Sequence, residues 1–324
     1  MTRDPSTLAA AARAIEDSET LALACHVGPD GDALGSMLGF AVAARDAGKE
    51  VVASFGSPFD LPSGLEFLPA DLLVPPKEFP SDPETMVVFD VGSAERIGEL
   101  ASNAGRAGTV VVIDHHVTNE GFGDVALIDH EAAATGELVY ELLGALRWQL
   151  SPQIAQCLLT ALVTDTGRFQ YSNTRPRTLE IAAELIAAGA EPAVIGRHVY
   201  EEAPFGYLKA SAIALGRAEL HADLGVVSTI LTQSDLDTAG LSWADTDNLI
   251  DLLRLPVEAD TAVLVKGHDD GRVKVSLRSR GATDVGSLAA AMGGGGHRLA
   301  AGFTSDGQPE DVRRKVLDSV EDYR

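Results

Sequence analysis

The sequence predicts an α/β protein of two domains, the first built on a doubly wound parallel sheet and the second smaller. Short apolar runs of strand length alternate with longer helical patterns through the first half of the chain, as in βαβ units. After residue 220, strand-like segments prevail. The chain has 324 residues, more than one ordinary domain needs, and its 45% hydrophobic residues suffice for two cores.

The elements of the first domain follow in that alternating order. Residues 6–17 have the pattern of an amphipathic helix, and residues 21–27 form an apolar run typical of a strand buried on both faces. A helix is expected over 33–48, where Gly48 provides a C-terminal cap. The remaining expected elements are strands at 51–55, 86–91 and 109–114 and helices at 133–147, 151–165 and 176–188.

The domain boundaries follow from the change in pattern. We expect the first domain over residues 1–190 and the second over 220–324, joined by a helical connector at 191–219. The second domain is expected to be a smaller α/β domain with a mixed sheet. Its expected elements are strands at 225–231, 261–266 and 272–277 and helices near 245–254 and 284–291.

Composition excludes several classes of protein. A net charge of −23 argues against a protein that coats duplex DNA, although it leaves room for a small anionic substrate at one local site. The two cysteines, Cys25 and Cys157, provide neither a disulfide framework nor zinc-type spacing, which predicts a reducing, cytoplasmic location. No apolar stretch reaches membrane-spanning length, and the N-terminus lacks the apolar core of a signal peptide.

Acidic and imidazole side chains follow three of the apolar runs. If these strands are parallel neighbours, their carboxyl ends meet at one crevice outside the sheet. A further acid follows the apolar helical segment 154–163 and can face the same place. The residues are His26, Asp30 and Asp32 after the first run, Asp90 after the second, Asp114, His115 and His116 after the third, and Asp165 after the helix.

The chemistry of such a cluster predicts bound cations. Clustered carboxylates repel one another and raise each other's pKa values, and divalent cations remove that cost. Oxygen and imidazole ligands without a thiolate favour Mn²⁺ or Mg²⁺ over structural zinc, and this number of ligands suits two ions. Two ions clamp the attacking and leaving oxygens of an in-line displacement at phosphorus and acidify a water as nucleophile. Asp90 or Asp165 alone is more typical of a turn or cap. The prediction therefore depends on all the clusters occurring together, each after a buried run.

The second domain contains a glycine run inside a basic island. Gly293–Gly296 precede His297 and Arg298, and we expect a loop whose backbone amides approach an anion closely. Taken alone, such a run is typical of a flexible turn. Residues 266–298 carry six cations against three anions, a net charge of +3 in an acidic chain, which favours a local phosphate grip. Alternation in the strand at 272–277 places Lys274, Ser276 and Arg278 on one face.

These motifs resemble those of the DHH phosphoesterase superfamily. The match runs in order through HVGPDGD at 26–32, Asp90, DHH at 114–116 and Asp165, without a departure at a ligand position. GGGGHRLAAG at 293–302 resembles the signature of the DHHA1 domain. The two motif sets cover nearly the whole chain. The short layout is similar to that of the group of oligoribonucleases that are also 3′-phosphoadenosine-5′-phosphate phosphatases.

The resemblance implies a role for each residue. His26 and Asp30 would hold one Mn²⁺, and Asp32, His115 and Asp165 the other, with Asp90 as the bridge. Asp114 would orient a ligating imidazole, and His116 would lie near the scissile phosphate as a donor to its oxygens or to the leaving group. The implied substrate-binding residues are Ser276, Arg278, Gly294, Gly295, Gly296, His297 and Arg298.

The resemblance also implies an activity. We expect a cleft between the two domains in which a manganese-dependent phosphodiesterase degrades short oligoribonucleotides to 5′-mononucleotides. Adenosine 3′,5′-bisphosphate and linear or cyclic dinucleotides are related expected substrates, duplex DNA and membranes are not expected partners, and a homodimer is implied. Two alternatives stay open: a RecJ-like single-strand DNA exonuclease, for which the chain is short, and a nucleotide sensor without catalysis. A family-II pyrophosphatase is disfavoured because its partner domain lacks the glycine–histidine signature.

Overall fold

The computed structural model describes residues 5–119, 121–246 and 248–324. The chain divides into two compact units, Met1–Glu201 and Glu202–Arg324. The segment expected as a connector contains α7 (Pro192–Ile195), a π-helical stretch (Gly196–Glu201) and α8 (Gly206–Gly216). The first two belong to the first unit and α8 belongs to the second.

The first unit confirms the predicted parallel α/β fold. Its five strands pair in parallel in the order β2-β1-β3-β4-β5. Their bounds are β1 Thr20–Cys25, β2 Glu50–Phe55, β3 Thr85–Phe89, β4 Thr109–Asp114 and β5 Val125–Ile128. The apolar runs in β3 and β4 are buried almost throughout because helices cover both faces.

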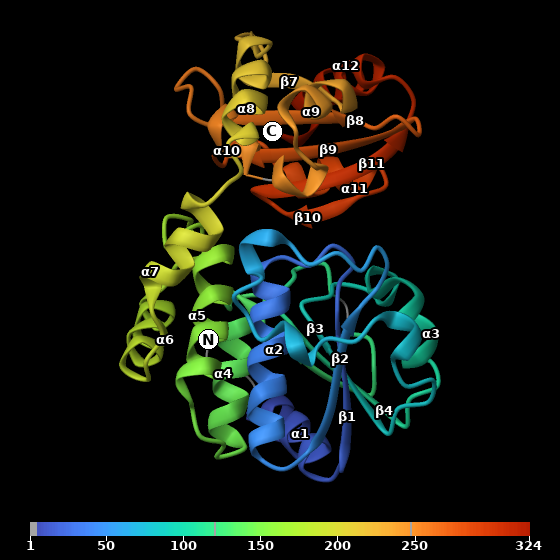
Figure 1. The fold of residues 1–324 in the computed structure, drawn as a ribbon, viewed down its shortest axis with the longest axis vertical. Helices are drawn as coiled ribbons and strands as arrows, with labels where there is room; N and C mark the ends of the chain where they lie inside the picture. Colours follow the sequence, from blue (N-terminus) through green and yellow to red (C-terminus); the bar gives the residue numbers. More distant parts are fainter. Residues whose placement is uncertain (1–4, 120, 247) are drawn as a thin grey trace. The chain divides into compact units, whose positions relative to one another are not determined.

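Two layers of helices cover this sheet (Figure 1). One face packs on α1 (Pro5–Glu16), α2 (Gly31–Asp46) and α4 (Thr135–Ala145), and α5 (Pro152–Asp165) and α6 (Pro176–Ala187) pack against these helices from outside. The other face packs on α3 (Ala101–Ala104) and the preceding 3₁₀ segment Ala94–Leu100. Alternate residues of one strand enter the two cores: Leu23 faces the first and Ala24 the second.

Helix α2 begins at the ligand-bearing loop and is buried along nearly its whole length. Its N-cap is Asp30, whose carboxylate accepts hydrogen bonds from the amides of Asp32 and Ala33, both at 3.0 Å. Small residues let α2 approach α5 closely. A Cβ on Gly35 would lie 2.5 Å from the carbonyl oxygen of Cys157 in α5. This packing fixes the start of α2 against the end of α5, where Asp165 lies.

The second unit is a six-stranded mixed sheet in the order β10-β11-β9-β8-β7-β6. Only β7 and β8 run parallel to each other; the other neighbours are antiparallel. The strands are β6 Glu219–His221, β7 Val226–Thr232, β8 Thr261–Gly267, β9 Arg272–Ser279, β10 Gly295–His297 and β11 Ala300–Asp306.

Helices cover both faces of this sheet as well. One core contains α11 (Val285–Ala291) and α12 (Pro309–Ser319), and the other contains α8, α9 (Gln233–Ala239) and α10 (Leu249–Leu253). Strands β7, β8 and β9 and the helix at 284–291 lie where the sequence predicts them. Strands β6, β10 and β11 and helices α9 and α12 were not predicted from the sequence.

The glycine run differs from the expected open loop. Gly295, Gly296 and His297 form β10, which pairs with β11. A Cβ on Gly294 would lie 2.2 Å from the carbonyl oxygen of Gly302, and one on Gly296 would lie 2.6 Å from that of Ala300. The missing side chains therefore let two strands of the sheet pack closely, which explains why a run typical of a turn becomes a strand.

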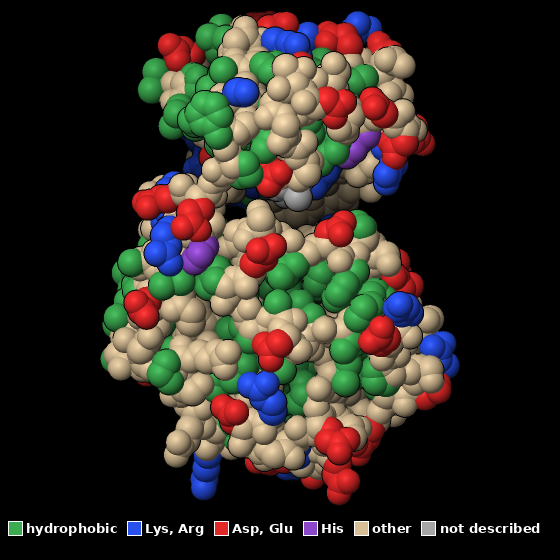
Figure 2. All heavy atoms as spheres, in the orientation of Figure 1, with side chains coloured by type: hydrophobic (Ala, Val, Ile, Leu, Met, Phe, Trp, Pro, Cys, Tyr) green, Lys and Arg blue, Asp and Glu red, His purple; other side chains and the backbone are tan. Residues whose placement is uncertain are grey.

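The surface in Figure 2 has acidic and basic side chains interspersed over both units, without one continuous basic face on the side in view. This distribution accords with the net charge of −23. Within the described ranges, no helix combines the length and the apolar character that a membrane crossing requires.

Candidate metal centre and substrate-binding face

Neighbouring parallel strands bring the predicted ligands together. His26 follows β1, Asp90 follows β3, and Asp114 ends β4. The chain leaves β1 toward β2 on one side and continues through β3 and β4 on the other, so this edge is the switch point where ligands bind in open α/β sheets. The C-terminal end of α5 contributes Asp165 from the helical layer.

Two clusters of ligand atoms form at this edge. In the first, His26 Nε2 lies 3.6 Å from Asp90 Oδ2 and 3.8 Å from Asp30 Oδ1. In the second, His115 Nε2 lies 3.6 Å from a carboxylate oxygen of each of its three neighbours, Asp32, Asp90 and Asp165. These separations exceed a hydrogen bond. Two ligands that each lie about 2.1 Å from a common ion are roughly 3–4 Å apart, so both clusters have the spacing of a coordination sphere.

Asp90 belongs to both clusters. Its Oδ2 faces His26, and its Oδ1 faces His115 at 3.6 Å. The Thr135 hydroxyl donates to Oδ1 at 2.9 Å, and the backbone amide of Asp90 donates to the carbonyl of Ile113 at 2.9 Å. These bonds hold Asp90 in a left-handed conformation with φ of 58°, which an aspartate rarely adopts. The strained backbone aims one oxygen at each cluster.

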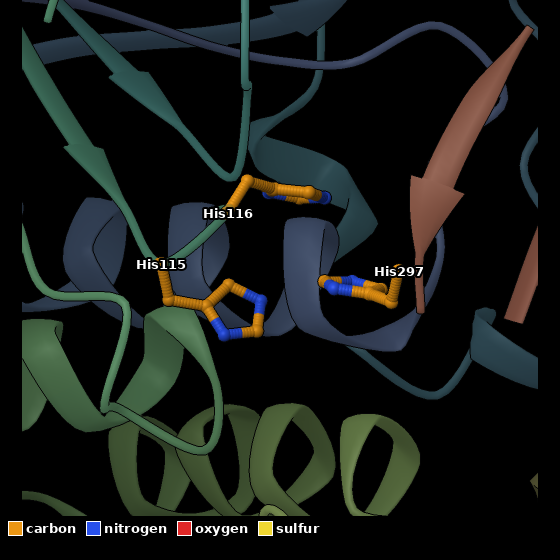
Figure 3. Close-up of side chains that lie close together, drawn as sticks. All are labelled: His115, His116 and His297. Atoms are coloured by element: carbon orange, nitrogen blue, oxygen red, sulfur yellow. The ribbon is translucent and has the colours of Figure 1, made fainter. Parts of the chain in front are cut away.

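Backbone carbonyls orient the two imidazoles of these clusters. His26 Nδ1 donates to the carbonyl of Val27 at 3.1 Å, and His115 Nδ1 donates to that of Ala132 at 3.2 Å. The proton on Nδ1 leaves Nε2 as the atom that faces the carboxylates. Figure 3 shows His115 and His116 as they leave the end of β4, and it also shows His297 on β10.

Asp114 contacts His116. His116 Nδ1 donates to Asp114 Oδ1 at 2.7 Å, and Asn119 donates to Asp114 Oδ2 at 2.7 Å and to the carbonyl of Val91 at 3.1 Å. Burial alone lowers the pKa of His116, but its bond to Asp114 and the charge of Asp90 raise it above the usual value. The bond to Asp114 fixes the orientation of the His116 ring. Asn119 could not be predicted from the sequence because no motif links it to Asp114.

The start of α4 holds Asp32. The amides of Thr135 and Gly136 donate to its two oxygens at 2.7 and 3.0 Å, and Ser36 donates at 2.9 Å. Backbone amides at a helix start favour an anion there, which keeps this buried carboxylate in place. Thr135 and Gly136 were also missed. Their sequence signal is a small polar residue and a glycine near the start of the helix expected at 133–147.

The electrostatics of the clusters fit divalent cations. Burial alone lowers the pKa values of His26 and His115, but the surrounding aspartates raise both to about 10. Burial and the charge of Asp90 raise the pKa of Asp32 well above its usual value. The carboxylates thus require positive charge beside them. Their oxygens, together with two imidazoles and no thiolate, are a donor set that suits Mn²⁺ or Mg²⁺.

The exposed face of β9 presents the predicted basic residues of the second unit. Val273, Val275 and Leu277 enter the core, so the side chains at even positions point away from it. Ala300 of β11 pairs with both Arg278 and His297, which places these two residues on the same face of the sheet. Arg278 Nε lies 3.8 Å from Asp251 on α10.

Hydrogen bonds fix the turn that follows β9. The Asp260 carboxylate accepts from the amides of Ala282 and Thr283 and from the Ser279 hydroxyl, all at 3.0 Å. Arg280 donates to the carbonyls of Arg254 and Leu255 at 2.6 and 2.8 Å, and Arg298 donates to that of Gly281 at 3.4 Å. Arg280 and Arg298 therefore bond to the loops around Arg278. Arg298 is one of the predicted substrate contacts.

Comparison with protein families matches both units. The DHH family, N-terminal domain, matches residues 20–162, and the DHHA1 domain matches residues 225–323. A bifunctional oligoribonuclease and PAP phosphatase NrnA of Thermus thermophilus is 33% identical over 308 residues, 92% of this chain and 88% of that protein. The protein of the same name in Bacillus subtilis is 28% identical, over 90% of each chain.

Solved structures share the fold. An exopolyphosphatase-related protein from Bacteroides fragilis superposes with a TM-score of 0.89 at 24% identity, over 98% of both chains. RecJ of Thermus thermophilus, crystallised in complex with Mn²⁺, gives a TM-score of 0.58 at 13% identity, over 98% of this chain and 55% of RecJ.

Proposed function

Because this chain belongs to the DHH/DHHA1 phosphoesterase family, we propose that it hydrolyses short oligoribonucleotides to 5′-mononucleotides and removes the 3′-phosphate of adenosine 3′,5′-bisphosphate. The names of the relatives from Thermus thermophilus and Bacillus subtilis support both activities. The observation that carries the proposal is the pair of ligand clusters that share Asp90. Such a pair suits displacement at phosphorus.

We propose that two Mn²⁺ ions occupy these clusters, with Mg²⁺ as a substitute. His26, Asp30 and Asp90 would hold one, and Asp32, Asp90, His115 and Asp165 the other. When bound, the ions supply Lewis acidity toward the phosphate and an acidified water. The carboxylate oxygens at 3.6–3.8 Å from the two imidazoles support this assignment.

In this proposal His116 acts on the substrate. Its Nδ1–H is held by Asp114, so its Nε2 is the atom that can donate to a phosphate oxygen or to the leaving oxygen. Asn119 holds Asp114 in turn. The chain of bonds Asn119–Asp114–His116 therefore sets both the orientation and the protonation of the imidazole.

In this proposal the second unit binds the substrate. Arg278 and Ser276 on β9 would bind phosphate, and His297 with the backbone of Gly295 and Gly296 in β10 would contact the nucleotide. Arg298 supports the site through Gly281. A homodimer and a cytoplasmic location complete the proposal; two free, buried cysteines support the reducing location.

The test is a hydrolysis assay with Mn²⁺. Labelled di- to pentaribonucleotides, adenosine 3′,5′-bisphosphate, a cyclic dinucleotide, a long single-stranded DNA and pyrophosphate are offered separately. We expect rapid hydrolysis of the oligoribonucleotides and the bisphosphate, lost in Asp90→Ala. Hydrolysis of the long DNA alone would replace the proposal by a RecJ-like exonuclease, and binding of nucleotides without turnover would replace it by a sensor.

A further inference from the structure

The exposed row on β9 continues past the substrate residues described above. Arg278, Ser276 and Lys274 are alternate residues of one strand and share its outward face. Successive side chains in such a row are about 6.6 Å apart, and Arg278 and Lys274 about 13 Å. One such step is close to the internucleotide spacing of an extended single strand. Beside the row, β11 presents the small residues Ala300 and Gly302.

An aromatic pair lies at the Lys274 end of this row. Trp243 and His268 have ring centroids 4.4 Å apart and an interplanar angle of 34°. His268 comes directly after β8, and its amide donates to the carbonyl of Arg272 at 2.9 Å, which fixes it at the start of β9. Trp243 Nε1 donates to Gln233 Oε1 at 2.7 Å, which holds the indole in one orientation. Both rings are partly exposed, as a stacking platform requires.

Cations gather between the row and the platform. Lys266 on β8 pairs directly with Lys274 on β9, and the Lys266 side chain is only 1% exposed. Burial lowers the pKa of His268. The charge of Asp270 raises this pKa, and the cations Arg272, Lys266 and Lys274 lower it further. A neutral imidazole stacks on a base without repelling these cations.

We propose that this face is a single-strand track for the nucleotides beyond the second. Successive phosphates contact Arg278, Ser276 and Lys274, and a base stacks on the Trp243–His268 pair. This inference rests on the proposed function and deepens it, because it assigns a length-dependent part of substrate binding to named residues. Dinucleotides and adenosine 3′,5′-bisphosphate are too short to reach from Arg278 to the platform, whereas tetra- and pentanucleotides reach it.

The kinetic test compares substrate lengths in variants of the track. In Lys274→Gln and in Trp243→Ala we expect kcat/KM for the pentaribonucleotide to fall about tenfold, mainly through KM, since base stacking and a phosphate contact are each of that order. Hydrolysis of the dinucleotide and of adenosine 3′,5′-bisphosphate should stay within about twofold of wild type. Trp243→Phe retains an aromatic face and should restore most of the loss. Lys315→Gln, which removes an exposed charge on α12 at the opposite face of the sheet, is the matched control.

A binding measurement separates the track from catalysis. Trp148 and Trp243 are the two tryptophans of the chain, so in Trp148→Phe the remaining indole reports on the platform. We expect a pentaribonucleotide to quench its fluorescence and a dinucleotide not to, with metal removed to prevent turnover.

The outcomes distinguish the two proposals. Equal losses for short and long substrates in Lys274→Gln and Trp243→Ala, or no loss for either, would overturn the track while the proposed function stands. Absence of hydrolysis by the wild type would overturn the proposed function, and the fluorescence experiment would then decide the track alone. Lys274 is exposed, so its variant decides the kinetic question even if Trp243→Ala does not fold.

Discussion

Backbone strain at single residues concentrates beside the metal centre. Among the described residues, Asp90, Arg147, Arg168 and Phe169 have a positive φ without being glycine. Asp90 belongs to both ligand clusters, and Arg168 and Phe169 follow Asp165 by a few residues. Strain of this kind persists where the surrounding contacts enforce it, and at Asp90 it aims the carboxylate. Arg147 is the exception, since it lies at the end of α4.

Arg147 offers a test of what such strain costs. It occupies the position after the C-cap of α4, where Trp148 donates to the carbonyl of Leu143 at 3.0 Å, an arrangement that favours glycine. We expect Arg147→Gly to raise the free energy of unfolding by roughly 0.5–1 kcal/mol, because glycine adopts the left-handed conformation without strain. Urea denaturation measures this, and hydrolysis should be unchanged. A loss of stability would show that the arginine side chain contributes more than its backbone costs.

Asn119 is a positioning residue in this account. Asn119→Ala removes the donor that holds Asp114, so His116 loses its fixed orientation. We expect kcat to fall by about 10- to 100-fold with a smaller change in KM. Asn103→Ala is the control, since Asn103 also donates from its amide to a carbonyl, that of Pro80, but away from the ligand clusters. A matching loss of kcat in both variants would mean that the effect is one of stability alone.

At the scale of elements, the close contact of α2 with α5 positions ligands from both helices. Gly35→Ala would place a methyl group 2.5 Å from the carbonyl oxygen of Cys157. We expect a loss of about 1–3 kcal/mol in the free energy of unfolding and weaker metal binding, because the helices must separate. Gly144→Ala in α4 meets nothing within 4 Å and should stabilise the protein by about 0.5–1 kcal/mol. Equal effects of the two substitutions would contradict this packing.

The turn after β9 depends on the carboxylate of Asp260. Burial alone raises the pKa of Asp260, but the bonds from Ala282, Ser279 and Thr283 lower it below the usual value. A lowered pKa in the folded state stabilises the protein above the unfolded pKa of about 3.9, and that contribution is lost as pH falls through the folded pKa. Asp260→Asn should therefore cost about 1.5–3 kcal/mol at pH 7, with a difference from wild type that shrinks in acid. A difference that is constant with pH would contradict this role.

The ligands at the strand ends of the first unit were predictable because a local pattern, an apolar run followed by acids, marks the positions that the parallel sheet brings together. Buried apolar runs identify β1, β3 and β4, and the acids that follow them lie at one edge once the strands are parallel. The glycine strand β10 was not predictable by this reasoning, because its glycines suit a neighbour, β11, that the local pattern does not reveal. Thr135 and Asn119 depend in the same way on contacts between distant segments.

At the scale of the whole molecule, the two units present different kinds of functional side chain. The first unit gathers carboxylates and imidazoles at the edge of a parallel sheet, and the second presents a basic strand face in a chain whose net charge is −23. An acidic protein with one local basic face discriminates against long polyanions and retains short ones through specific contacts. The proposed preference for short oligoribonucleotides therefore depends on the charge of the whole chain as well as on the site.

The central claim is that two ions share Asp90, and anomalous diffraction from crystals grown with Mn²⁺ tests it most directly. The account predicts two peaks about 3.5–4 Å apart, one beside His26 and Asp30 and one beside His115, Asp32 and Asp165, with an oxygen of Asp90 on each. A single peak, or two peaks that Asp90 does not join, would contradict it.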